Sequence, residues 1–142
     1  MNNLKILLFL FVFMLGSINL SAQPNDAPPT VYAADAHSYS NPQAARVRHV
    51  DLDWRVSFDR KVLEGTATLT VERARSSVAG AERLILDTRD LNIEKVETSA
   101  NGANFRRAEF KLGAADKILG APLEINLPPG AKYVRVFYVT SP

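Results

Sequence analysis

The residues best suited to chemistry in this sequence are a histidine and two aspartates at alternating positions. His49, Asp51 and Asp53 are separated by single apolar residues. On a β-strand they would share one face, about 6–7 Å apart at each step, which could bring an imidazole and two carboxylates to one metal ion. The alternative is an ordinary solvated strand face opposite an apolar one. We adopt the second interpretation, because the alternation itself explains the polar residues.

Two further pairs of polar residues could take part in chemistry. Asp35 and His37 lie in a proline-rich segment with no second imidazole nearby, so we expect no ion site there. Asp87 and Asp90 could act as a general acid and a general base. Two carboxylates between short apolar segments are more typical of a turn, and we expect them to cap one. We therefore assign no catalytic, cofactor-binding or metal-binding residue to this chain.

The composition excludes several other kinds of site. The 142 residues include no cysteine and only two histidines, which rules out disulfides, zinc–thiolate sites and cysteine nucleophiles. The sequence has no G-x-S-x-G motif, and its glycines are isolated rather than gathered in a phosphate-binding loop. A formal charge of +2 is too small to argue for a nucleic-acid partner. With 46% apolar and 23% charged residues, the chain has the composition of one globular domain.

The first 22 residues have the features of a secretory signal peptide. Lys5 precedes an unbroken apolar run, Ile6 to Leu15, and Ser21 and Ala22 offer small residues for cleavage. The run is shorter than the about 20 apolar residues that a membrane-spanning helix needs. We therefore expect an exported protein, periplasmic or secreted, with no membrane association after cleavage. An N-terminal anchor that is not cleaved is the alternative.

The sequence after residue 22 begins with an extended, proline-rich lead-in over residues 23–45. From Val50 to Phe58, apolar residues then occupy every second position, which predicts a strand with one buried face and places Trp54 in the core. Residues 66–73 alternate between threonines and apolar residues, typical of an antiparallel partner strand. We expect a loop at residues 75–81 and further strands at residues 83–88, 91–96, 106–112, 121–127 and 132–139.

No segment carries the 3.6-residue apolar period of a helix, so we predict an all-β domain over residues 46–142. Its sheets would be antiparallel or mixed and curved, as in a saddle or sandwich. The segment 132–139 is apolar on both faces, which predicts a central strand, reached through a tight turn at Pro128-Pro129-Gly130. Because the chain ends directly after this strand, we expect the domain to be incomplete at its C-terminal end, with an apolar face and an open sheet edge left bare.

Short segments spread over residues 35–142 resemble, in order, the N-terminal domain of zinc aminopeptidases of the leukotriene-hydrolase type, peptidase family M1. The segments are residues 35–42 (DAHSYSNP), 49–53, 56–59, 61–69, 86–91, 119–125 and 140–142. The resemblance implies a curved β-saddle domain that packs beside a catalytic domain and forms one wall of the peptide-substrate cleft. It also implies that the partner of this chain is that catalytic metallopeptidase domain, in cis or missing.

In that family the zinc ligands and catalytic residues lie further along the chain, in an H-E-x-x-H helix with a distal glutamate and in a G-x-M-E-N loop. Neither motif occurs in this sequence, so zinc is expected only in the catalytic domain. The resemblance therefore implies a non-catalytic domain of an exported zinc aminopeptidase. A free-standing secreted β-module that binds a protein or a glycan is the alternative, and a product that does not fold is a third. The oligomeric state stays open.

Overall fold

The computed structural model describes residues 35–73 and 82–142, which form strands and turns. No helix in these two ranges is long and apolar enough to cross a membrane. The signal peptide expected at residues 1–22, the first part of the lead-in and the loop expected at residues 75–81 lie outside the described residues. The prediction of an all-β, antiparallel fold is confirmed over the part that is described.

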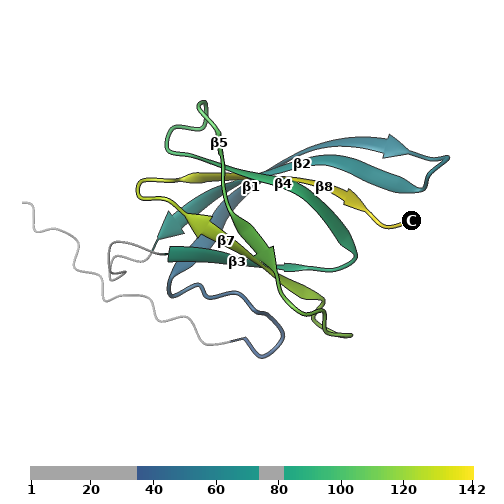
Figure 1. Ribbon diagram of the computed structural model, residues 1–142, viewed down its shortest axis with the longest axis horizontal. Coiled ribbons are helices and arrows are strands. Elements are labelled where there is room, and N and C mark those ends of the chain that lie inside the picture. Colours follow the sequence, from purple (N-terminus) through teal and green to yellow (C-terminus); the bar gives the residue numbers. More distant parts are fainter. Residues whose placement is uncertain (1–34, 74–81) are drawn as a thin grey trace, which may run out of the picture. The chain divides into compact units, whose positions relative to one another are not determined.

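Eight strands make up two antiparallel sheets (Figure 1). They are β1 (Ala45–Ser57), β2 (Val62–Arg73), β3 (Glu82–Thr88), β4 (Leu91–Ser99), β5 (Arg106–Arg107), β6 (Phe110–Leu112), β7 (Ala121–Leu127) and β8 (Tyr133–Thr140). The five-stranded sheet has the order β1-β2-β8-β4-β5, and the three-stranded sheet has the order β3-β7-β6. The first strand begins at Ala45, one residue before the domain boundary predicted at residue 46.

The first two strands form the long antiparallel pair that the alternating pattern predicts. Their register runs from Ala45 opposite Arg73 to Ser57 opposite Val62. The connecting turn contains Lys61 at φ 55°, a left-handed conformation that is uncommon for a residue with a side chain. Among the described strands, β1 pairs only with β2 and therefore forms one edge of the five-stranded sheet.

The core is built from side chains of both sheets. Val134 and Val136 of β8 are buried, and β8 pairs with β2 on one side and β4 on the other, which confirms the predicted central strand. The buried aliphatic residues of the core cluster are Leu69, Val71, Val96, Val134 and Val136 from the five-stranded sheet and Leu84, Leu123, Ile125 and Leu127 from the three-stranded sheet. The two sheets therefore cover one another over this region.

The prediction of one strand over residues 106–112 is wrong, because the chain changes sheet in the middle of that segment. The Ala108 nitrogen donates to the Val96 carbonyl oxygen at 2.9 Å, in the five-stranded sheet. The next carbonyl, that of Glu109, accepts from the Asn126 nitrogen at 3.0 Å, in the three-stranded sheet. Ala108 is buried at the crossing, where its small side chain lets the backbone pass between the sheets.

The turn at Pro128-Pro129-Gly130 also connects strands of different sheets, since β7 lies in the smaller sheet and β8 in the larger one. The Ala131 nitrogen donates to the Pro128 carbonyl oxygen at 3.1 Å, which closes the turn. Gly130 has φ 78°, a conformation that glycine adopts without the steric cost of a side chain. The predicted tight turn is present, and it reverses the chain from one layer into the other.

The prediction that the apolar face of β1 is buried is wrong. Its large side chains are exposed by about half, at 46% for Val50, 51% for Leu52, 45% for Trp54 and 52% for Val56, and Phe58 beyond the strand is 87% exposed. The alternation is correct, but the three-stranded sheet covers only the beginning of this edge strand, where Ala45 is buried, and leaves the residues from Val50 onward about half exposed. The sequence pattern defines two faces of a strand, and it does not define which part of a face another layer covers.

Candidate functional site

Of the histidine and two aspartates of β1, the structure brings His49 and Asp51 together. The His49 Nε2 atom lies 3.1 Å from the Asp51 Oδ1 atom, and both side chains are exposed. Within residues 35–73 and 82–142, no three histidine, aspartate or glutamate side chains are grouped so that they could hold a metal ion. Two donors do not meet the requirement of catalytic zinc for three protein ligands, so this pair does not fit the ion.

The other candidate carboxylates serve local structure. The Asp35 Oδ1 atom accepts a hydrogen bond from the His37 backbone nitrogen at 2.8 Å, which is an Asx turn. Asp87, at the end of β3, accepts from the Ser38 hydroxyl at 2.6 Å and from the Tyr39 nitrogen at 2.8 Å. Its carboxylate therefore ties the lead-in to the sheet and does not cap the β3–β4 turn, contrary to the prediction.

Three residues after Asp87, Asp90 occupies that β3–β4 turn with φ 53°. Its carbonyl oxygen accepts a hydrogen bond from the Ser141 nitrogen at 3.0 Å. Asp90 thus holds the last residues of the chain, whereas Asp87 binds the lead-in. The Asp87 carboxylate and the Asp90 backbone carbonyl therefore hold different segments of the chain, and none of these contacts joins the two carboxylates as a general acid and base.

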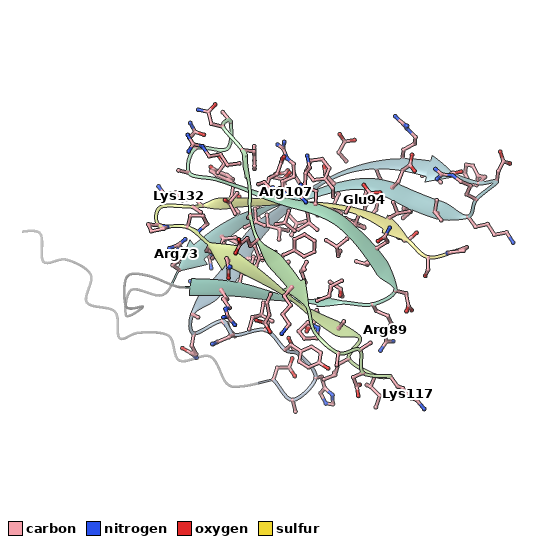
Figure 2. The ribbon with its side chains drawn as sticks, in the orientation of Figure 1. Arg73, Arg89, Glu94, Arg107, Lys117 and Lys132 are labelled. Carbon is pink, nitrogen blue, oxygen red and sulfur yellow. The ribbon has the colours of Figure 1, made fainter. Side chains whose placement is uncertain are left out.

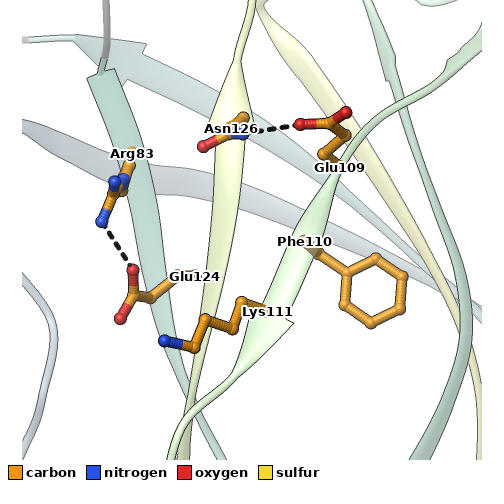
Figure 3. A pocket seen from close by; sticks show the side chains of 6 residues that line it. All are labelled: Arg83, Glu109, Phe110, Lys111, Glu124 and Asn126. Atoms are coloured by element: carbon orange, nitrogen blue, oxygen red, sulfur yellow. Dashed lines mark hydrogen bonds and ion pairs between the residues drawn. The ribbon is translucent and has the colours of Figure 1, made fainter.

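A shallow hollow of about 340 Å³ lies over the three-stranded sheet (Figure 3). Arg83 donates to Glu124 at 2.8 Å, and the Asn126 amide donates to Glu109 at 3.4 Å. Lys111 also lines the hollow. The charged groups compensate one another across neighbouring strands, as cross-strand pairs on a solvated sheet face do. The arrangement brings no unpaired nucleophile or carboxylate pair together.

A second hollow, of about 470 Å³, lies beside the turn between β6 and β7. The Asp116 carboxylate accepts hydrogen bonds from the backbone nitrogens of Leu119 at 2.9 Å and Ile118 at 2.7 Å. These bonds, with a smaller contribution from the nearby Arg89 guanidinium, hold the pKa of Asp116 below its usual value. Arg89 also donates to the Lys117 carbonyl oxygen at 3.3 Å, and Figure 2 shows both side chains at this end of the fold. The carboxylate therefore shapes a turn.

An exposed surface that these contacts do not explain is the apolar strip of β1, which we define as Val50, Leu52, Trp54 and Val56. Each member stands opposite a residue on the same face of β2, and the pairs are Val50 with Leu69, Leu52 with Ala67, Trp54 with Gly65 and Val56 with Leu63. Leu69 is 5% exposed and belongs to the core, whereas its partner Val50 is about half exposed. The strip is therefore an uncovered continuation of the core face.

Trp54 is held in place by a contact across a glycine. Gly65 pairs with Trp54 on one side and with Tyr138 on the other. Because Gly65 has no side chain, the Trp54 Nε1 atom reaches over β2 and donates to the Tyr138 hydroxyl at 2.7 Å. The exposed indole at the centre of the strip is therefore fixed in orientation, which lowers the entropy that it would lose on binding.

The tip of the hairpin carries a cluster of charges on the opposite face. The Arg60 guanidinium donates to the Glu64 carboxylate at 2.6 Å, and Arg55 lies 3.6 Å from the same carboxylate. The hydrogen bond from Arg60 is the largest cause and lowers the pKa of Glu64. Burial opposes it, and the charges of Arg60 and Arg55 add smaller effects that lower the pKa. This cluster fixes the turn that ends the strip.

On the polar face of the five-stranded sheet, the aromatic rings are covered by cationic side chains of the same sheet. The Arg135 guanidinium lies 3.8 Å from the centre of the Phe105 ring, and the Lys95 ammonium lies 3.9 Å from the centre of the Phe137 ring. Arg135 also donates to the Thr68 hydroxyl at 3.2 Å. Cations thus cover the aromatic rings of this face. The apolar strip has no such cover among the described residues, and it is the best candidate for a functional surface.

Comparison with curated proteins shows clear relatives of this chain. It is 37% identical over 95 residues to leukotriene A-4 hydrolase of Xenopus laevis, which covers 67% of this chain and 14% of that protein. It is 34% identical over 102 residues to leucine aminopeptidase 2 of Candida albicans, covering 72% of this chain and 15% of that protein. The chain thus spans about 15% of the length of such relatives. No protein-family model matches it.

Solved structures with the same fold come from the same group of proteins. Yeast LTA4 hydrolase in complex with bestatin matches with a TM-score of 0.65 at 24% identity, over 84% of this chain and 17% of that chain. Native leukotriene A4 hydrolase of Saccharomyces cerevisiae matches with a TM-score of 0.66 at 23% identity, over 84% and 18%. The chain therefore belongs to the family of leukotriene A-4 hydrolase and leucine aminopeptidase 2, peptidase family M1, and corresponds to the N-terminal part of these proteins.

Proposed function

We propose that this chain is the non-catalytic N-terminal domain of an exported zinc aminopeptidase, which packs on the catalytic domain and forms one wall of its peptide-substrate cleft. The observation that carries the proposal is the match to the N-terminal part of leukotriene A-4 hydrolase, in sequence and in fold. The proposed role is that of a scaffold. Zinc and the residues that activate water would belong to the catalytic domain.

The distribution of donor groups supports a role without catalysis. A catalytic zinc site needs three protein ligands and a general base for the bound water. The sequence offers two histidines and neither H-E-x-x-H nor G-x-M-E-N. In the part of the chain that the structure describes, the paired groups His49 and Asp51 have no third ligand within reach.

The apolar strip supports a role in packing. Exposed apolar patches on a soluble domain mark interaction sites, and this one continues the core face beyond the three-stranded sheet. Its alternate side chains stand on a rigid strand, and Trp54 is fixed by Tyr138. A surface of this kind suits an apolar partner that covers the sheet from one side.

The proposal is tested first with the purified full chain. We expect no stoichiometric zinc by elemental analysis and no release of the chromophore from aminoacyl-anilide substrates. We further expect the chain to form a complex with the catalytic part of a related leukotriene A-4 hydrolase from which the matching N-terminal segment has been removed. One-to-one zinc with steady turnover by the chain alone would overturn the proposal.

Export rests on the first 22 residues and is tested separately. We expect N-terminal sequencing of the protein recovered from the periplasm or the medium to begin at Gln23. Deletion of residues 6–15 should keep the chain inside the cell, because the apolar region of a signal peptide is what the export machinery recognises. A chain that is recovered with its first residue intact and outside the membrane would contradict this part of the proposal.

A further inference from the structure

The free edge of β1 is a second unexplained feature of this sheet. β1 is 13 residues long and contains no proline. It hydrogen-bonds to β2 alone, so alternate N–H and C=O groups along its other side have no strand partner among the described residues. A long, exposed edge strand with one apolar face is a template for pairing with another chain. From this edge we propose that two copies of this chain associate through β1, antiparallel, about a two-fold axis at Trp54.

The charges along β1 specify this register. In an antiparallel pair about a two-fold axis, residues equally distant from the axis on the two copies stand opposite one another. With Trp54 on the axis, Asp53 of each copy faces Arg55 of the other, which gives two ion pairs. On the opposite face Leu52 meets Val56, and the indoles of Trp54 meet at the centre. Between residues 51 and 57, every polar residue therefore faces a neutral or oppositely charged one, and every apolar residue faces an apolar one.

Other registers of the same kind are less favourable. An axis at Leu52 places Asp51 opposite Asp53 twice, and an axis at Asp51 or Asp53 places a carboxylate opposite itself. Like charges directly opposite one another destabilise a strand pair. An axis at Val50 runs into the irregularity of the strand between Val47 and His49, where side chains change faces. The Trp54 register is the one in which charge and apolar patterns agree.

Pairing in this register also joins the apolar strips of the two copies into one surface. The indole of Trp54 needs no rearrangement, because its bond to the Tyr138 hydroxyl already fixes it. Asp53 is exposed, and Arg55 is 82% exposed at its side chain and lies 3.6 Å from Glu64 of its own copy, so a second copy can reach both groups and Arg55 would be shared between Glu64 and the partner's carboxylate. The charge pattern of this edge is therefore complementary to the same edge of a second copy of the chain.

Charge reversal tests the register. Sedimentation of the full chain should show a reversible monomer–dimer equilibrium. Asp53→Arg alone and Arg55→Asp alone each turn two attractive pairs into repulsive ones, and each should raise the dissociation constant at least about tenfold. The double variant D53R/R55D exchanges the charges and should return the dissociation constant to near that of the unchanged chain. A chain that stays monomeric at all concentrations, or single reversals without effect, would overturn the proposal.

A matched control separates this register from its neighbours. Asp51 faces an uncharged residue, Ser57, in the Trp54 register, so Asp51→Arg should leave the dissociation constant within about twofold. In a dimer whose two-fold axis passes through Asp53, Asp51 would instead face Arg55 of the other copy. The same substitution would then replace an attractive pair with a repulsive one and raise the dissociation constant. Circular dichroism of each variant confirms that its sheets are intact.

Cross-linking gives a second measurement that does not depend on the charge variants. Because the chain has no cysteine, any disulfide that forms must join the cysteines that were introduced. Asp51→Cys combined with Ser57→Cys should form disulfide-linked dimers under mild oxidation, since these residues face one another between copies. Each single cysteine variant should remain largely uncross-linked. Equal cross-linking of the single variants would contradict the proposed axis.

Discussion

The centre of the apolar strip depends on Gly65, a residue without a side chain. Gly65 lies between Trp54 and Tyr138, and its empty position lets their polar atoms meet. A Cβ atom at Gly65 would lie 2.0 Å from the Asp53 carbonyl oxygen, closer than any real contact. The glycine is therefore required by the close approach of β1 and by the hydrogen bond that crosses it.

Gly65→Ala is consequently expected to destabilise the fold. The backbone of β1 must move away, and overpacking of this kind costs about 1–3 kcal/mol in the free energy of unfolding. The measurement is urea denaturation followed by circular dichroism. Gly130→Ala is the control for backbone strain, since a Cβ there meets nothing within 4 Å and only the left-handed conformation opposes it. Equal stability losses for both variants would contradict the steric explanation.

Glu64 makes stability depend on pH at the acidic end. The Arg60 hydrogen bond lowers the pKa of Glu64 in the folded state, so the unfolded chain binds its proton more readily. The stabilisation is therefore complete above the unfolded pKa, near 4.5, and is lost as the pH falls through the folded value. We expect the melting temperature to fall on acidification and to fall less steeply in Glu64→Gln.

Asp116 also makes the fold less stable as the pH falls, because its pKa is lowered in the folded state. Glu64→Gln should therefore remove part of the acid sensitivity, and Asp116→Asn should remove a further part. Thermal melts of the two variants and of their combination at neutral and acidic pH check this. A variant pair with the same pH profile as the unchanged chain would show that neither carboxylate contributes.

At the scale of the element, β1 and β7 have comparable patterns but different surroundings. Both alternate apolar and polar residues, yet Leu123 of β7 is 1% exposed and Leu52 of β1 is 51% exposed. β7 is the central strand of the smaller sheet and faces the larger one, whereas β1 extends beyond the smaller sheet. Position in the sheet, and not hydrophobicity, decides the burial of each strand.

The difference predicts opposite outcomes for substitutions in the two strands. Leu123→Ala should cost about 2–5 kcal/mol of unfolding free energy, because it leaves a cavity in the core. Leu52→Lys should change that free energy by about 0.5 kcal/mol or less. It should nevertheless reduce the binding of a hydrophobic dye. Urea denaturation and dye fluorescence measure the two effects, and a large stability loss for Leu52→Lys would contradict the exposed position.

At the scale of the whole described unit, the chain passes repeatedly between the two sheets. It changes sheet between β2 and β3, between β3 and β4, between β5 and β6 and between β7 and β8. The crossing at Ala108 and Glu109 places consecutive residues in different sheets. Neither sheet is a continuous segment of sequence, so we expect the two sheets to lose their pairing together.

We therefore expect residues 35–142 to unfold in one cooperative transition. Trp54 is the only tryptophan and reports on the edge of the larger sheet, whereas far-ultraviolet circular dichroism reports on both sheets. Urea transitions measured by the two signals should coincide. Loss of the tryptophan signal well before the circular dichroism signal would indicate that the β1–β2 hairpin opens independently.

The sequence by itself determined the strands and most of their bounds. Alternation is a local property that reflects the two faces of a strand, so it identified β1, β2, β7 and β8 and the central place of β8. It also excluded thiol chemistry and any H-E-x-x-H site, because the residue types are absent. The ordered resemblance over residues 35–142 indicated the family that the relatives confirm.

Only the tertiary structure decided which faces are covered and where the chain changes sheet. The exposure of Trp54 depends on how far the three-stranded sheet extends, and residues distant in sequence set that limit. The split at Ala108 likewise depends on hydrogen bonds to β4 and β7, which no local pattern encodes. The burial of a face, and the point at which the chain changes sheet, depend on contacts between segments that are distant in sequence. The tendency to form a strand depends on the residue pattern within each segment.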